Sequence, residues 1–462
     1  MAGIFKNDKF VLLLLCLVYI GISYNVESPT IDTLALMGWL GISQLVFSLI
    51  AWMKRGNQFL SPYILFLLTL YMFSYGQSFL WAFGLESERT LIGFYGITIP
   101  EIFKAQIWTI VMLAFFQIGA SYYVDNYVHN YNVDNVAADT TNKLKRIGWI
   151  LFVVSVIPYT SETIQDLIIS MTKGYGAIYG AGKVGFDNIA GFIADYFMPS
   201  VICLFIVYRN NRVMRNFLLS IIGLNIIAIL LTGGRSNAVI LMSLVLIMYN
   251  YLVRRFTRKW IIVGVVGGFF LLQILAVVAN VRTDAGRSAS VSEVKLENNG
   301  AVDAVAEMGS TMFCLIKSQD IVPSKEDYRY GKSYLYSFTT IIPNLGFWAI
   351  HPATKESNLG DWLTAELGLG YGTGFSMCAE AYVNFGYLCF LEFFFWGIFL
   401  AKVFGRIEIS VKTTDYALLA FLLILFWFFL KLPRNNFINL VRPIFFVAGP
   451  IYLYCKKITT RK

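Results

Sequence analysis

The sequence predicts an all-α polytopic membrane protein with about twelve transmembrane helices and one long extracytoplasmic loop that carries short helices. Of its 462 residues, 57% are apolar and only 14% are charged, which leaves too little polar surface for a soluble chain of this length. Apolar segments alternate with short basic loops, and a long polar segment interrupts this alternation once. We therefore expect the first nine helices in residues 1–280, the loop in residues 281–375, and three helices with a cytoplasmic tail in residues 376–462.

The predicted spans have about 17 to 25 residues each, enough for a helix to cross roughly 30 Å of hydrocarbon. The first span is not expected to be a signal peptide, because no small-residue cleavage site closes it and Pro29 and Asp32 lead directly into the next span. In order, the spans lie at residues 9–24, 31–53, 60–83, 103–124, 147–169, 189–208, 216–232, 237–253, 260–280, 376–401, 415–432 and 438–455.

Most basic residues fall in alternate turns between these spans. Short cytoplasmic loops carry an excess of Lys and Arg, so this pattern predicts that both termini are cytoplasmic. It also accounts for the net charge of +9 without a nucleic-acid partner. The basic turns hold Lys54 and Arg55, then Lys143, Lys145 and Arg146, then Arg209, Arg212 and Arg215, then Arg254, Arg255, Arg258 and Lys259, then Lys402, Arg406 and Lys412, and finally the tail residues Lys456, Lys457, Arg461 and Lys462.

The long outer segment shows helical periodicity in two places. Both apolar stripes predict short helices that lie on the membrane surface or cap the bundle. Trp362 also belongs to a group of aromatic residues suited to stacking on sugar rings, which an interfacial aromatic belt explains as well. The first stripe consists of Val302, Val305, Met308, Met312, Leu315 and Ile316, and the second of Leu359, Trp362, Leu363 and Leu367.

Several arginines lie at the outer ends of spans, where a charge near lipid is costly. Arg235 follows Gly233 and Gly234 in a tight turn, where backbone N–H groups, a helix N-terminus and a fixed guanidinium suit a phosphate. Arginines from three regions could thus converge on one diphosphate through bidentate hydrogen bonds. Snorkelling to lipid headgroups is the alternative for each of them. The predicted diphosphate-binding residues are Arg235, Arg282 and Arg434, with Arg287 and Arg442 in support.

Two residues are candidates for a general base. Glu380 lies about one turn inside the tenth span, where a carboxylate predicts either a functional role or an ion pair with an arginine. His351 lies in the outer loop and is the other candidate. Tyr382, Asn384 and Trp362 are candidate substrate contacts. The six cysteines and two histidines show no metal-ligand spacing, so no metal site and no cofactor are predicted.

Two stretches carry a resemblance to a known family. They are Thr232-Gly233-Gly234-Arg235-Ser236 and Gly374-Phe375-Ser376-Met377-Cys378-Ala379-Glu380-Ala381-Tyr382-Val383-Asn384-Phe385-Gly386. Together with the order of many helices, an arginine turn, a long outer loop and a Glu-x-Tyr-x-Asn-Phe-Gly helix, they resemble bacterial oligosaccharide repeat-unit polymerases. These are the Wzy-type enzymes of O-antigen, capsule and exopolysaccharide assembly. The resemblance covers roughly the C-terminal half, and no recognisable motif lies in the first six spans.

The resemblance implies an inverting glycosyltransferase of the GT-C kind in the bacterial cytoplasmic membrane. Its substrates would be two oligosaccharides linked to undecaprenyl diphosphate at the outer face. The arginines would stabilise the leaving diphosphate without a metal, and Glu380 or His351 would take the proton of the attacking hydroxyl. Alternatively, Glu380 would orient an arginine. Membrane lipid, and a chain-length regulator and a flippase of the same pathway, are the expected partners.

Three other classes of protein share part of this pattern. An O-antigen ligase would share the arginines and the loop, and would differ only in its acceptor. A lipid-linked oligosaccharide flippase would need no base and usually no long outer domain, so the loop disfavours a transporter. A membrane O-acyltransferase would need a histidine inside a span, and neither His129 nor His351 lies in one.

Overall fold

The structure is a computed structural model that describes residues 7–126, 137–173, 189–257, 259–260 and 300–456, except residues 343, 345, 347, 370 and 371. Within these ranges, all regular elements are helices. Eleven helical segments are long and apolar enough to cross a membrane, and they coincide with eleven of the predicted spans. The chain is therefore an all-α, multi-pass membrane protein, as predicted. Nearly all of the remaining span, at residues 260–280, lies outside the described residues, as do Arg282 and Arg287.

The chain divides into two compact units, each assembled from segments that are far apart in sequence. The first unit contains residues 1–130, 301–404 and 432–441, and the second contains residues 131–300, 405–431 and 442–462. Each unit is described by itself. The predicted division at residues 280 and 375 concerns the order of spans and loop along the chain, and it stays a prediction.

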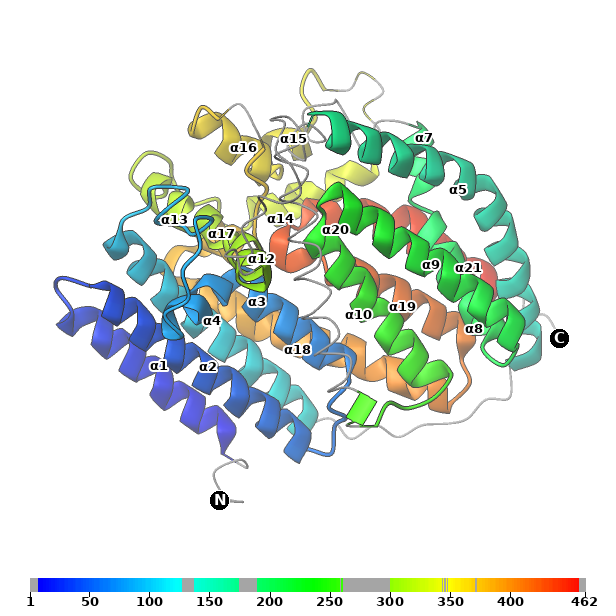
Figure 1. Cartoon of the computed structure of the whole chain (residues 1–462), viewed down its shortest axis with the longest axis horizontal. Helices are drawn as coiled ribbons and strands as arrows, with labels where there is room; N and C mark the ends of the chain where they lie inside the picture. The colour runs from blue at the N-terminus through cyan, green and yellow to red at the C-terminus, as the bar shows by residue number, and fades with distance from the viewer. Residues whose placement is uncertain are drawn as a thin grey trace, which may run out of the picture. The chain divides into compact units, whose positions relative to one another are not determined.

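The first unit is built around its four N-terminal helices. Helices α1 (Asp8–Asn25), α2 (Ile31–Lys54), α3 (Pro62–Ala82) and α4 (Ile99–Asn126) lie side by side, with α2 against α3 and α1 against α4 (Figure 1). The other helices of this unit come from the second half of the chain. They are α12 (Gly300–Gly309), α13 (Met312–Ile321), α14 (Lys332–Ser337), η2 (Phe338–Ile341), α15 (Pro352–Glu356), α16 (Leu359–Glu366), α17 (Met377–Phe385), η3 (Gly386–Leu388), α18 (Cys389–Lys412, up to Phe404), η4 (Leu432–Arg434) and α20 (Ile438–Arg442, up to Val441).

Two glycines bring the backbones of α4 and α18 into direct contact. A Cβ atom added at Gly119 would lie 2.0 Å from the carbonyl oxygen of Phe394, and one added at Gly397 would lie 2.0 Å from that of Phe116. Any side chain at either position would collide with backbone. Small residues at helix crossings of this kind are typical of membrane proteins, because they allow helices to approach closely.

The first apolar stripe of the outer segment was expected as one helical surface, and the structure divides it between α12 and α13. Gly309 packs so closely on α3 that an added Cβ would lie 2.4 Å from the backbone nitrogen of Gln77. Next to it, the hydroxyls of Ser310 and Thr311 bond to the carbonyls of Glu307 and Met308, at 2.7 and 2.9 Å, and α12 ends. Because α13 packs against α3, α4, α16 and α17, these helices cap the bundle.

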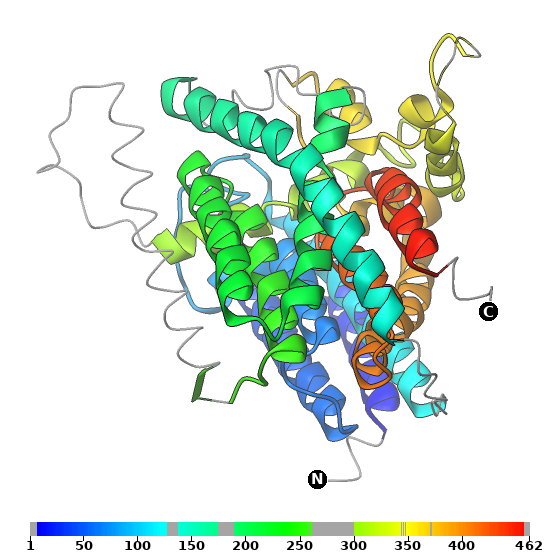
Figure 2. The ribbon, with the colours of Figure 1, turned by 90° about the vertical axis from the view of Figure 1, so that its right-hand side faces the viewer.

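The second unit has α5 packed against α8 and α9, and α19 packed against α8, α10 and α21 (Figures 1 and 2). Asn211 caps the start of α9 by accepting a hydrogen bond from the N–H of Met214 at 3.1 Å. The helices of this unit are α5 (Ala137–Lys173), α7 (Ile189–Ala194), α8 (Phe197–Tyr208), α9 (Arg212–Thr232), α10 (Arg235–Leu252), α19 (Tyr416–Phe429), the π-helix η5 (Pro443–Ala448) and α21 (Gly449–Lys456).

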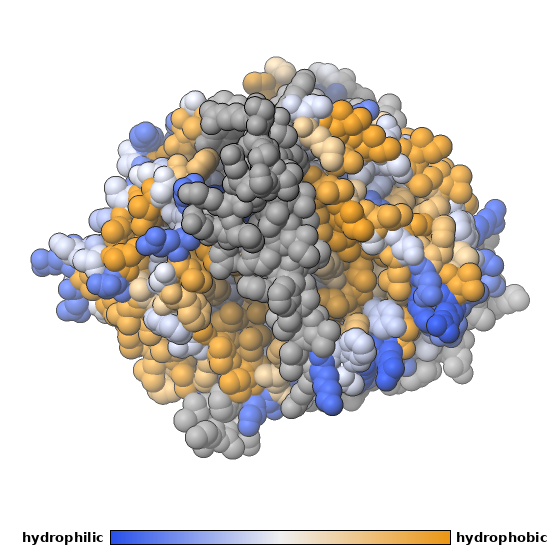
Figure 3. Space-filling view, viewed as in Figure 1, coloured by the Kyte–Doolittle hydropathy of each residue, from blue (hydrophilic) through white to orange (hydrophobic). Residues whose placement is uncertain are grey.

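Apolar side chains cover much of the face that Figure 3 shows. Leu17 of α1, Ile157 of α5 and Leu224 of α9 are all largely exposed. In water such a surface would be unfavourable, whereas lipid tails can cover it at no cost. The surface therefore agrees with the membrane assignment.

Candidate functional site

The carboxylate of Glu380 is buried in the first turn of α17. This helix begins after Ser376, whose hydroxyl accepts a hydrogen bond from the N–H of Ala379 at 3.1 Å, as an N-cap does. Glu380 is 1% exposed. Its Oε1 accepts a hydrogen bond from the Ser333 hydroxyl at 2.7 Å, and its Oε2 accepts one from the backbone N–H of Phe437 at 2.6 Å. These donors replace the water that the carboxylate lost on burial.

The Ser333 hydroxyl is held in turn by Asn384, one helical turn after Glu380. The side-chain amide of Asn384 donates to the Ser333 hydroxyl and to the Glu380 carbonyl, both at 2.8 Å, and its oxygen accepts from the N–H of Gly331 at 3.0 Å. Ser333 therefore accepts from Asn384 and donates to Glu380. This order fixes the direction of the hydroxyl proton and the rotamer of the carboxylate.

Two backbone hydrogen bonds join the outer segment to the end of α17. The N–H groups of Arg329 and Tyr330 donate to the carbonyls of Val383 and Asn384, both at 2.9 Å. Tyr330 and Gly331 then have positive φ values of 48° and 82°, a conformation that suits glycine. This turn leads into α14, which carries Ser333 to the carboxylate of Glu380.

The guanidinium of Arg329 lies in the same region and was not a predicted site residue. It donates to the Glu356 carbonyl at 2.8 Å, lies 3.9 and 4.0 Å from the carboxylates of Glu326 and Glu356, and stacks over Trp362 at 5.2 Å. Burial lowers the pKa of Arg329, and the charges of Glu326, Glu356 and Glu380 oppose that effect. Sequence reasoning missed Arg329, because an arginine within a long polar segment carries no sign of burial.

Arg434, the predicted diphosphate ligand of the first unit, ends η4, which packs against α3 and α17. Residues 432–437 form a tight turn, called the 432–437 turn below. The side chain of Asn436 ties this turn to the Ser357 carbonyl at 3.1 Å, and the N–H of Phe437 ties it to Glu380. Arg434 and Glu380 are thus connected within the first unit through three residues of chain and one hydrogen bond.

A second buried carboxylate, Glu392 of α18, contacts the neighbour of Ser333. Its Oε1 accepts from the Tyr334 hydroxyl at 2.6 Å and from the indole N–H of Trp396 at 3.0 Å. Burial and the charges of Glu392 and Glu380 raise the pKa of Tyr334. Its hydroxyl therefore stays protonated and donates the hydrogen bond to Glu392. Two consecutive residues of α14 therefore each bind one carboxylate of the membrane-spanning segment 377–412.

His351 lies at the N-cap of α15, where both of its ring nitrogens have partners. Its Nδ1 accepts from the N–H of Ala353 at 3.2 Å, which leaves Nε2 to donate to the carbonyl of Ile342 at 3.2 Å. The ring also packs edge-on against Trp348, with centroids 5.0 Å apart. Accepting a substrate proton would require one of these hydrogen bonds to be exchanged.

The three predicted substrate contacts are engaged with protein groups in the structure. The hydroxyl of buried Tyr382 donates to the Val322 carbonyl at 3.1 Å, and the indole N–H of Trp362 donates to Glu326 at 3.1 Å. Asn384 is buried with both ends of its amide bonded, as described above. Of the three, only Trp362 retains partial exposure, so it is the one best placed to touch a sugar without rearrangement.

Arg235 lies in the second unit as the first residue of α10, and it is 6% exposed. The preceding Gly233 has φ 95° and ends α9, as a left-handed C-cap does. The carbonyl of Thr232 accepts from the hydroxyl of Ser170 at 2.7 Å, which fixes the turn against α5. The predicted tight turn around Arg235 is thus present.

Arg442, the last residue of α20, also belongs to the second unit.

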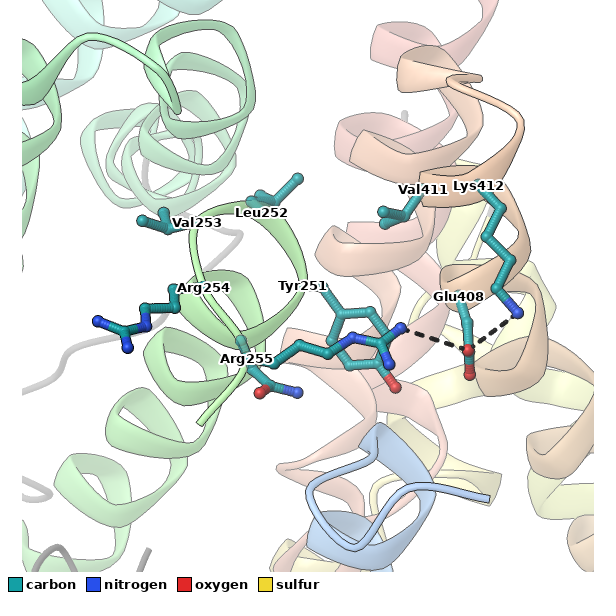
Figure 4. A pocket seen from close by; sticks show the side chains of 9 residues that line it. Tyr251, Leu252, Val253, Arg254, Arg255, Glu408, Val411 and Lys412 are labelled. Atoms are coloured by element: carbon teal, nitrogen blue, oxygen red, sulfur yellow. Dashed lines mark ion pairs between the residues drawn. The ribbon is translucent and has the colours of Figure 1, made fainter. Parts of the chain in front are cut away.

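The second unit also contains a cavity of about 160 Å³ at the C-terminal ends of α10 and α18 (Figure 4). Glu408 lies between two cations there, 3.9 Å from Arg255 and 3.1 Å from Lys412. The ion pairs are largely exposed, and pairs of that kind contribute little to stability. None of the predicted site residues lines this cavity.

Chemically, the region around Glu380 offers a fixed carboxylate beside a turn that carries a guanidinium. A carboxylate can accept the proton of an alcohol, and a guanidinium can stabilise a phosphate oxygen. Among the residues that the structure describes, no group of three or more His, Cys, Asp or Glu side chains is close enough to hold a metal ion.

A family model described as "O-antigen polysaccharide polymerase Wzy" matches residues 9–462, nearly the whole chain. No curated protein and no solved structure matches the chain.

Proposed function

Since the chain belongs to the O-antigen polysaccharide polymerase Wzy family, we propose that it joins oligosaccharide repeat units carried on undecaprenyl diphosphate at the outer face of the bacterial cytoplasmic membrane. The match over residues 9–462 carries this proposal. The buried carboxylate of Glu380, on the segment that resembles this family, supplies a chemical group that glycosyl transfer requires.

In the proposed reaction, a sugar hydroxyl of one lipid-linked unit attacks the anomeric carbon of another. The new glycosidic bond forms while the bond from that carbon to the diphosphate breaks, so a single displacement inverts the configuration. The hydroxyl proton passes to a base, and the bonding electrons leave with undecaprenyl diphosphate. Stabilising the charge on this leaving group and removing the proton are the two tasks of the protein.

We assign the proton to Glu380. Each of its carboxylate oxygens accepts one hydrogen bond from the protein, and each has a further lone pair, so the group keeps acceptor capacity. His351 is the second candidate, at the cost of one of its ring hydrogen bonds. The geometry also supports the other role for Glu380, because its bond to Phe437 holds the turn that carries Arg434.

We assign the diphosphate to the predicted arginines, each considered by itself. Arg434 belongs to the first unit and lies in the 432–437 turn, which Glu380 holds through the N–H of Phe437. Arg235 follows two glycines at the start of α10, and its guanidinium is the donor assigned to a phosphate oxygen, because the N–H groups of Gly233, Gly234 and Arg235 donate to carbonyls within the turn. Arg442 is assigned a supporting role. Arg282 and Arg287 lie outside the described residues, and their assignment rests on the sequence alone.

The direct test is polymerisation by the purified protein in liposomes that contain purified lipid-linked repeat units. A ladder of products that differ by one repeat unit is expected, without an added metal ion. Transfer of a single glycan to a different acceptor would identify a ligase instead. Movement of the lipid-linked unit across the bilayer without any product would identify a flippase.

The proposed orientation places both termini in the cytoplasm and residues 281–375 outside. A cysteine introduced at Ser290 should react with a membrane-impermeant thiol reagent in intact cells, whereas one introduced at Thr257 should react only after permeabilisation. The opposite labelling pattern would contradict the orientation. A chain-length regulator and a flippase of the same pathway are the proposed protein partners.

A further inference from the structure

Glu392 has an unusual hydrogen-bond arrangement for a carboxylate within a membrane-spanning segment. Both of its donors, the Tyr334 hydroxyl and the Trp396 indole, bind the same oxygen, Oε1. Its other oxygen is buried and has no hydrogen-bond partner among the described residues. A leucine of similar size would fill this place without the cost of burying a carboxyl group. Stability alone therefore gives no reason for a glutamate at this position.

The two donors share a second contact, the ring of Phe437. The centroid of this ring lies 5.4 Å from that of Tyr334 and 6.2 Å from that of Trp396, and Phe338 closes a third side at 5.7 Å. All these contacts are edge-to-face, the geometry that aromatic pairs prefer. We call Tyr334, Phe338 and Trp396 the Phe437 cage. Glu392 joins two of its three members through one oxygen.

Phe437 links this cage to the proposed reaction centre. Its backbone N–H binds Oε2 of Glu380 at 2.6 Å, and it ends the 432–437 turn that carries Arg434. A ring that cannot rotate away keeps its own backbone in place, because ring and N–H belong to the same residue. The position of the Phe437 ring thus sets both the N–H that holds Glu380 and the end of the 432–437 turn that carries Arg434.

We propose that Glu392 is a positioning residue for glycosyl transfer: by binding Tyr334 and Trp396, it closes the Phe437 cage and fixes the 432–437 turn relative to Glu380. This inference rests on the proposed function, because it requires that Glu380 and Arg434 act in the reaction. Glu392 itself touches neither substrate nor the reacting atoms. Its part in the reaction is to keep a carboxylate and an arginine in one fixed geometry.

The test compares three variants in the liposome assay, with kcat and KM expressed per folded protein. Glu392→Leu removes both hydrogen bonds from Glu392 to the cage, and Tyr334→Phe removes the one from Tyr334. We expect kcat to fall on the order of 10- to 100-fold, since a displacement of about 1 Å at a reaction centre can cost that much, while KM changes little. Glu392→Gln keeps a carbonyl oxygen that can accept from both donors, so it should retain most of the wild-type kcat.

Two control variants match these changes elsewhere in the first unit. Tyr336→Phe removes a hydroxyl from α14, the helix that carries Tyr334, and Glu366→Gln neutralises an exposed carboxylate. Neither side chain has a hydrogen bond among the described residues. Both should behave as wild type. Thermal unfolding of each variant separates a loss of kcat from a loss of folded protein, and Tyr334→Phe supplies the result if Glu392→Leu does not fold.

A further measurement distinguishes positioning from a general loss of packing. If the cage acts by placing the 432–437 turn, Arg434→Ala should reduce kcat much less in the Tyr334→Phe background than in the wild type. If Arg434→Ala lowers kcat by the same factor in both backgrounds, the proposal is overturned. A wild-type kcat in both Tyr334→Phe and Glu392→Leu would also overturn it. So would equal damage by Glu392→Gln and Glu392→Leu. If the wild-type protein itself makes no ladder, the proposed function fails, and the inference fails with it.

Discussion

Replacing Ser333 with alanine tests whether the outer segment takes part in the reaction. The substitution removes the hydroxyl that donates to Oε1 of Glu380 at 2.7 Å, and it takes one partner from the amide of Asn384. Glu380 would keep the N–H of Phe437 as its only donor among the bonds described above. Because α14 reaches Glu380 through this hydroxyl, the orientation of the carboxylate should suffer while the fold remains.

The expected size of the effect follows from the charge of the acceptor. A hydrogen bond to a charged group contributes about 1.5–3 kcal/mol. If that energy orients the carboxylate in the transition state, its loss corresponds to a fall in kcat of roughly 10- to 100-fold, at about 1.4 kcal/mol for each factor of ten. KM should change little, since the hydroxyl of Ser333 is buried and binds Glu380.

Ser337 provides the matched control on the same helix. It is also a buried serine, but its hydroxyl donates to the backbone carbonyl of Ser333 at 2.6 Å and has no contact with Glu380. Initial rates of ladder formation in liposomes, per folded protein, should therefore fall for Ser333→Ala and not for Ser337→Ala. Equal rates for the two variants, whether high or low, would refute the reasoning.

Three further predictions use the same assay or the stability of the purified protein. If Glu380 is the base, Glu380→Gln abolishes polymer formation while lipid-linked substrate still binds, and His351→Ala keeps substantial activity; the reverse pattern would assign the base to His351. Arg235→Lys should be nearly as damaging as Arg235→Ala at normal protein levels, because an ammonium cannot reproduce bidentate binding; full activity of the lysine variant would reduce Arg235 to a diffuse charge. Gly397→Ala should lower the unfolding temperature by forcing α18 away from α4, because overpacking of this kind typically reduces the free energy of unfolding by about 1–3 kcal/mol. Gly405→Ala, on the same helix with open space around its Cβ position, should be neutral or slightly stabilising, and similar losses for both would contradict the crossing geometry.

The membrane-spanning helices could be predicted because each one carries its own signal. A helix such as α19 is a continuous apolar run after the N-cap Asp415, which accepts from the N–H of Leu418 at 3.0 Å. Length and composition alone determine such an element. The division between α12 and α13 was not predicted, because the close contact of Gly309 with α3 at Gln77 depends on the tertiary fold.

Only part of the candidate site could be predicted from the sequence. Glu380 could be found, because a carboxylate within an apolar helix is rare and costly. Ser333, Tyr334 and Arg329 could not, because serine, tyrosine and arginine are ordinary in a polar segment. Ser333 meets Glu380 across 47 residues of chain, and no local pattern encodes such a contact. The partners of a buried charge follow from the tertiary fold alone.

The two backbone hydrogen bonds between Arg329 and Val383 and between Tyr330 and Asn384 have a consequence for how enzymes of this kind can diversify. They close a long excursion of the chain at its base, and backbone bonds do not depend on side-chain identity. Lengthening a closed loop costs only about 0.6 kcal/mol for each doubling of its length. The excursion can therefore grow or shrink between these bonds at small energetic cost while the carboxylate at its root keeps its place, provided that Phe338 and Ser357 keep their contacts with Phe437 and Asn436.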